Sequence, residues 1–118
     1  MMLNVLGTDY KITVKKYDED ETFERCSFAG YCDGFSKEIV ICDMSTCKGW
    51  EYEPEQTIVN AQKETLRHEI VHAFITESGL SANAHQPQYG WAKDEEIVDW
   101  IALQGMKIYK AWAEVDAL

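Results

Sequence analysis

The sequence has no long apolar run and is short of positive charge. Its purely apolar runs are only a few residues long, far below the roughly 20 that a membrane-spanning helix needs, so we expect no membrane partner. Only 11 Lys and Arg residues stand against 21 Asp and Glu, giving a formal net charge of −10. Such a surface repels phosphate backbones and argues against nucleic acid as a partner. It could attract basic partners, although acidity more often serves solubility.

The chain also lacks a recognisable leader and a cysteine framework. Its first residues, MMLNVLGTDYKITVKK, show no basic region followed by an apolar one, so we expect folded chain in place of a signal peptide. The four cysteines lack the tight CxxC spacing of structural zinc sites, and we expect free thiols in a cytoplasmic protein. They are Cys26, Cys32, Cys42 and Cys47.

What the chain does contain is enough apolar material for one core. Its 118 residues suit a single domain spanning 1–118, and 46% hydrophobic with 12% aromatic residues makes disorder a poor description. There are no internal repeats or low-complexity tracts. The oligomeric state is left open by the sequence.

The first half of the chain has the patterns of short strands. Leu3–Lys15 alternates imperfectly and predicts a strand that could break near Gly7. Cys26–Asp33 and the β-branched Glu38–Cys42 predict two more strands, joined as a hairpin through the Asp33-Gly34 turn signal. The first strand should bury one set of side chains, namely Val5, Tyr10, Ile12 and Val14.

The second half has helical periodicity. A helix is predicted from about Glu55 to Ser78 with Gly79 as its C-cap, followed by a loop over Ser81–Gly90 and a helix from Trp91 to about Ala113. The first helix should bury Leu66, Ile70, Ala73 and Phe74, and the second Ile97, Val98, Ile101, Gly105, Ile108 and Trp112. Strands followed by helices predict an α+β fold, with the helices packed on one face of a small antiparallel sheet of about three strands.

The segment His68-Glu69-Ile70-Val71-His72 has the HExxH pattern and falls inside the first predicted helix. Residues four apart lie on one helix face, so His68 and His72 can reach one Zn²⁺ at about 2.0–2.1 Å each. Glu69 would project beside the metal and act as the general base, taking a proton from a zinc-activated water and passing it to a leaving amine. The alternative is that both histidines are ordinary residues of a helix surface.

A catalytic zinc site needs a third protein ligand, and the second helix offers Glu95. Glu95 and Asp99 are four residues apart and share a face, so Glu95 could complete a two-His, one-Glu site. Asp99 could then accept a hydrogen bond from the far nitrogen of a ligating histidine. The alternative is that Glu95 and Glu96 only favour the N-terminal end of the helix dipole.

His85 is the rival third ligand, since it lies in the loop thirteen residues after His72. It could instead stabilise the oxyanion of a tetrahedral intermediate at the rim of the site, as could Tyr89. A loop histidine is more often simply solvated.

These motifs resemble those of gluzincin metallopeptidases, especially the ImmA/IrrE type. That family has an HExxH helix and then a glutamate ligand in an E-x-x-x-[ND]-x-[FY]-A context, matched here by Glu95, Asp99 and Ala102, with Ile101 at the aromatic position. The segments LGTDYKI, GYCDGFSKEIVIC and LRHEIVHAF also look like small zincin proteins of phages and their bacterial hosts. The resemblance covers roughly the whole chain, which does not look like a metzincin because xxGxxH does not follow HExxH.

The resemblance implies a zinc enzyme of the cytoplasm of a bacterial or phage-infected cell. It also implies a sheet whose edge strand lies above the active-site helix, where a protein or peptide substrate adds as an extended strand. Glu38–Cys42 is the candidate for that edge strand. The substrate itself is left open.

Three functions remain to be distinguished. The first is a zinc-dependent metallopeptidase that hydrolyses peptide bonds. The second is a non-catalytic zinc-binding interaction or regulatory module of a phage or bacterium with the same fold, and the third is a helical packing protein with accidental motif residues. The presence of Glu69 favours the enzyme, because a degenerate site would often lose its base first.

Overall fold

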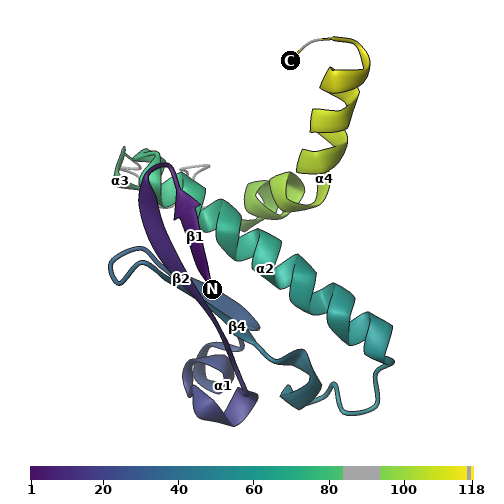
Figure 1. Ribbon diagram of the computed structural model, residues 1–118. Coiled ribbons are helices and arrows are strands. Elements are labelled where there is room, and N and C mark those ends of the chain that lie inside the picture. The colour runs from purple at the N-terminus through teal and green to yellow at the C-terminus, as the bar shows by residue number, and fades with distance from the viewer. Residues whose placement is uncertain (84–93, 117) are drawn as a thin grey trace.

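A computed structural model describes residues 1–83, 94–116 and 118 of the chain. It is an α+β fold in which a four-stranded sheet carries a long helix across one face (Figure 1). The strands lie in the order β1-β2-β4-β3, and their bounds are β1 Met2–Val5, β2 Thr8–Lys15, β3 Gly30–Asp33 and β4 Glu38–Cys42. The predicted α+β class is therefore confirmed.

The helices account for the connections and for the second half of the chain. Two short 3₁₀ turns, η1 Tyr17–Glu19 and η2 Met44–Thr46, flank the strands. The α-helices are α1 Thr22–Cys26, α2 Glu55–Glu77, α3 Leu80–Asn83 and α4 Glu95–Glu114. No helix in these described ranges is long and apolar enough to cross a membrane.

The two faces of the sheet bury different side chains because successive strand residues point to opposite sides. On the face covered by α2, a core forms from Val5, Tyr10, Ile12, Ile39, Ile41 and Ala73. On the opposite face, a second cluster forms from Phe23, Val40, Cys42 and Met44. Strand β4 contributes to both, which fixes the sheet between α2 and the α1 segment.

Two glycines let strand β3 approach helix α2 closely. A Cβ built on Gly30 would lie 2.8 Å from Thr65 Cγ2, and one built on Gly34 would lie 2.7 Å from Thr76 Cγ2. Either separation is too short for real carbon atoms, so a side chain at these positions would push the strand from the helix. Strand β3 therefore runs alongside the part of α2 that lies between Thr65 and Thr76.

The predicted antiparallel sheet of about three strands is wrong in two respects. The stretch Leu3–Lys15 does break near Gly7, as the sequence allowed, and forms two strands, so the sheet has four strands; Leu6 and Gly7 take positive φ values of 50° and 93° and turn the chain back. Strand β2 then pairs with β4 in parallel, while β1–β2 and β3–β4 are antiparallel, so the sheet is mixed.

The prediction that Glu38–Cys42 lies at an edge of the sheet is also wrong. The bounds of this strand are confirmed, but β4 lies inside the sheet between β2 and β3, and the edges are β1 and β3. Four of its five residues are buried, which fits its run of apolar residues, because a strand covered on both faces needs apolar side chains on both. The predicted hairpin between β3 and β4 is confirmed.

Three further expectations need correction. The strand predicted over Cys26–Asp33 begins only at Gly30, because α1 extends to Cys26 and Ser27 ends it in a left-handed conformation. Val14 is 53% exposed, since the covering helix leaves that end of β2 open. Phe74 is 42% exposed, because the buried side of α2 is centred on its neighbour Ala73.

The two long helices are otherwise as predicted. Helix α2 ends at Glu77, and Gly79 follows with a φ of 85°. The start of the second predicted helix, Trp91–Lys93, lies outside the described residues, as does the side chain of Trp112. Among the residues that were predicted to be buried on α4, Val98 is fully buried against Ile75 and Val71 of α2, whereas Ile101 is 37% exposed.

Candidate metal centre

Helix α2 presents two histidines one turn apart on the face that α4 meets. The Nε2 atoms of His68 and His72 lie 3.0 Å from each other. The first turn of α4 adds a carboxylate, and Glu95 Oε2 lies 3.0 Å from His68 Nε2 and 3.2 Å from His72 Nε2. Three potential ligand atoms from two helices thus converge on one point, as the sequence predicted for these residues.

Asp99 lies one turn after Glu95 and contacts the other side of the first imidazole. Its Oδ1 is 2.6 Å from His68 Nδ1. In the tautomer with the proton on Nδ1, this nitrogen donates to the carboxylate and Nε2 keeps a free lone pair directed at Glu95 and His72. Asp99 therefore contacts the far nitrogen of His68, where the sequence placed it.

Glu69 is the buried carboxylate of the site. Its side chain faces the sheet side of α2, and the residue is 6% exposed. His68, Glu69 and His72 present potential ligand atoms that all lie within 4.8 Å of one another. The pKa of Glu69 is raised to about 7, chiefly by burial and also by the negative charges of Glu95 and Asp99, while His68 opposes the shift. Such a carboxyl group can exchange a proton near neutral pH.

The three converging atoms fit a tetrahedral zinc ion. With ligands at about 2.0–2.1 Å, tetrahedral geometry separates the ligand atoms by about 3.3–3.4 Å. The separations between His68, His72 and Glu95 are 3.0, 3.0 and 3.2 Å, which a small side-chain adjustment brings to that value. Two imidazoles and one carboxylate are also a donor set that zinc accepts. Both histidines remain partly exposed, so a fourth position stays accessible.

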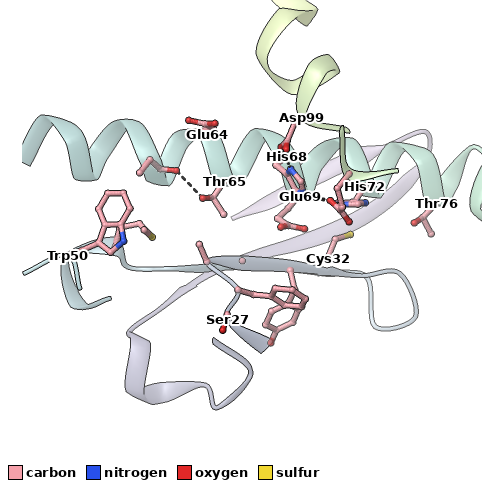
Figure 2. A pocket seen from close by; sticks show the side chains of 17 residues that line it. Ser27, Cys32, Trp50, Glu64, Thr65, His68, Glu69, His72, Thr76 and Asp99 are labelled. Atoms are coloured by element: carbon pink, nitrogen blue, oxygen red, sulfur yellow. Dashed lines mark hydrogen bonds and ion pairs between the residues drawn. The ribbon is translucent and has the colours of Figure 1, made fainter. Parts of the chain in front are cut away.

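A cleft of about 730 Å³ leads to these residues (Figure 2). One wall is α2, from Ala61 through the histidines to Thr76, and the other is the segment from Ser27 through strand β3 to Cys32. Figure 2 shows Glu69 and Cys32 facing each other across it, with Asp99 above His68. Strand β3 is at the edge of the sheet, and its residues Gly30, Tyr31 and Cys32 line this cleft.

The sequence did not reveal which other residues line the cleft. Gly30, Trp50 and Thr65 are among them but belong to no recognisable motif. The glycine was a weak signal, because a glycine inside a strand often marks a close backbone approach. Two predicted site residues, His85 and Tyr89, lie outside the described residues.

No family model, curated protein or solved structure matches this chain. Its function has therefore to be inferred from His68, His72, Glu95, Glu69 and the cleft around them.

Proposed function

We propose that this chain is a zinc-dependent metallopeptidase of the zincin type. One observation carries the proposal: the convergence of His68 Nε2, His72 Nε2 and Glu95 Oε2 within 3.0–3.2 Å of one another, from two packed helices. Two histidines that were only part of a helix surface would not be expected to converge with a carboxylate from a second helix. The buried carboxyl group of Glu69 next to them can supply the general base that hydrolysis needs in addition to a metal.

Each residue of the site has a distinct task in this account. His68, His72 and Glu95 would hold the ion, and bound zinc supplies a Lewis acid that lowers the pKa of water and polarises a carbonyl group. Glu69 would take a proton from the attacking water and return it to the leaving amine, which a buried carboxyl group with a raised pKa can do. Asp99 fixes the tautomer and the ring orientation of His68.

The open edge of β3 supports a peptide as the substrate. Residues of β3 line the cleft, and among the described strands β3 pairs with β4 alone, so its other edge is open. An extended peptide can add to such an edge through main-chain hydrogen bonds, which hold the backbone without demanding a particular sequence. This role falls to Gly30–Asp33 in place of the predicted Glu38–Cys42.

The experiment compares the wild type with Glu69→Gln after zinc loading. The substitution keeps the size of the side chain and removes the carboxylate, so the variant should retain both its fold and its metal. Hydrolysis of an unstructured protein such as casein should stop on chelation, return with zinc, and fall at least about a hundredfold in the variant. Equal activity in the two proteins would refute this mechanism. Zinc binding without hydrolysis by the wild type would favour the non-catalytic module instead.

A further inference from the structure

The cleft continues past the candidate metal centre toward the first half of α2, where its lining turns apolar. Phe28 comes from the segment before β3, Met44 and Trp50 come from the segment after β4, and Ala61 comes from α2. Trp50 and Ala61 pack together against the Phe23 cluster, while Phe28 is 50% exposed at the cleft. An apolar lining of this kind suits an apolar side chain or the apolar stem of a longer one.

Glu64 is the charged group at this end. It lies four residues before His68 and three after Ala61, and in Figure 2 it stands on α2 between the levels of Trp50 and His68. Its carboxylate takes part in none of the ion pairs found among the described residues. Within the part of the chain that the structure describes, this carboxylate is therefore available to a cation of a ligand.

The charges around the cleft are of one sign. Among the described residues that line it there is no Lys or Arg, and the carboxylates are Glu64, Glu69, Glu95 and Asp99. A bound Zn²⁺ would offset the charges of Glu95 and Asp99, and Glu69 is buried on the sheet side of α2. Glu64 is then the uncompensated charge beside the apolar end, in a cleft whose walls concentrate its field.

The spacing along the cleft relates Glu64 to the reacting bond. Gly30 lies opposite Thr65 and Gly34 opposite Thr76, so β3 and this part of α2 run side by side in the same direction. From His68 back to Glu64 is about 6 Å along the helix, at about 1.5 Å per residue. An extended peptide advances about 3.3 Å per residue, and every second side chain faces the same way. A side chain two residues from the reacting bond would therefore reach Glu64.

From this we infer that the cleft selects extended peptides with a Lys or Arg about two residues from the reacting bond. The cationic head would pair with the carboxylate of Glu64, and the aliphatic stem would lie against the apolar lining on the side of Trp50. This inference rests on the proposed peptidase function for its register, but the recognition itself requires only binding.

The test has a cleavage arm and a binding arm. For cleavage, the zinc-loaded wild type acts on a peptide library prepared from a denatured proteome with a Glu-specific protease, and mass spectrometry maps the cut positions. For binding, the zinc-loaded Glu69→Gln variant is titrated into a fluorescein-labelled peptide, Ala-Ala-Arg-Ala-Phe-Ala-Ala, and separately into the same peptide with Glu in place of Arg. Fluorescence anisotropy gives the two Kd values.

Charge reversal at Glu64 separates a specific contact from the general acidity of the protein. Glu64→Lys should lose the enrichment of Lys and Arg near the cut and should weaken binding of the Arg peptide about tenfold, since an attraction becomes a repulsion. Glu114→Lys, at the exposed end of α4, makes the same change in net charge and should alter neither result.

The outcomes distinguish this inference from the proposed function. Cleavage without enrichment of basic residues would overturn the inference and leave the peptidase standing. A preference for the Arg peptide in an otherwise inactive protein would overturn the peptidase and leave the recognition standing. Equal Kd values for the two peptides, or equal effects of Glu64→Lys and Glu114→Lys, would show that Glu64 selects nothing.

Discussion

Asp99 Oδ1 lies 2.6 Å from His68 Nδ1, and this contact joins helix α4 to the side of the first imidazole that faces away from the candidate metal position. The same helix supplies Glu95 one turn earlier. Both carboxylates are held in place by the packing of α4 on α2, where Val98 is fully buried against Ile75 and Val71. The geometry of the site is thus a consequence of how two helices pack.

The contact between Asp99 and His68 predicts an effect on zinc affinity. Asp99→Asn keeps the size of the side chain but removes the charge that favours a proton on Nδ1, so the affinity should fall by about 10- to 100-fold. Competition with a fluorescent zinc chelator measures it. Asp116→Asn, beyond the end of α4, is the control and should bind zinc as the wild type does. An unchanged affinity in Asp99→Asn would mean that the contact does not orient the ring.

The close approach of β3 to α2 predicts that Gly30 does not tolerate a methyl group. The added Cβ of Gly30→Ala would lie 2.8 Å from Thr65 Cγ2 and 3.0 Å from the carbonyl oxygen of Val40. We expect the free energy of unfolding in urea to fall by about 1–3 kcal/mol, as overpacking typically costs.

The same substitution at Gly105 provides a matched control of opposite sign. A Cβ there meets nothing within 4 Å, and the residue lies inside α4. Gly105→Ala should therefore raise stability by about 0.5–1 kcal/mol, because alanine is the better helix former. Similar effects at Gly30 and Gly105 would contradict the packing described for β3.

Glu77 predicts how stability depends on pH. Hydrogen bonds from Lys37, then Tyr10 and then Thr8 lower the pKa of Glu77 to about 2, whereas the unfolded chain has the ordinary value of 4.5. Because the folded state binds the proton more weakly, its contribution is complete above about pH 5 and is lost as the pH falls toward 2.

Urea unfolding of the metal-free protein between pH 5 and pH 2.5 measures this dependence. Glu77→Gln should be less stable at pH 5 and should lose less stability over that range than the wild type does. Glu114→Gln, which removes an exposed carboxylate without these partners, should retain the wild-type slope. A wild-type slope in Glu77→Gln would show that the hydrogen bonds do not perturb this group.

The sequence predicted the elements that have a strong periodic pattern and clear ends. Glu55–Glu77 combines helical spacing with the terminating Gly79, and Glu38–Cys42 is a β-branched run between polar segments. The convergence of the site residues was also predictable in part. Residues four apart must share a helix face, so His68 with His72, and Glu95 with Asp99, form two pairs before any packing is known.

The arrangement of the strands could not be predicted in the same way. Alternation tells which face a side chain takes but not which strand lies next to it, so the parallel pairing of β2 with β4 left no local trace. Gly7 indicated a possible break between β1 and β2, but nothing in the sequence indicated that Leu6 also takes a positive φ there. The wall formed by Gly30 depends on contacts with Thr65, 35 positions further along the chain, and these arise only on folding.

The central claim is that His68, His72 and Glu95 together hold one zinc ion. Zinc content per chain, measured after zinc loading and extensive dialysis, tests it most directly. We expect one zinc in the wild type and in Glu96→Ala, whose carboxylate is adjacent in sequence but takes no part in the converging contacts. We expect none in His68→Ala or His72→Ala and a marked loss in Glu95→Ala. A wild type without zinc, or a Glu95→Ala variant that retains it as Glu96→Ala does, would contradict this account.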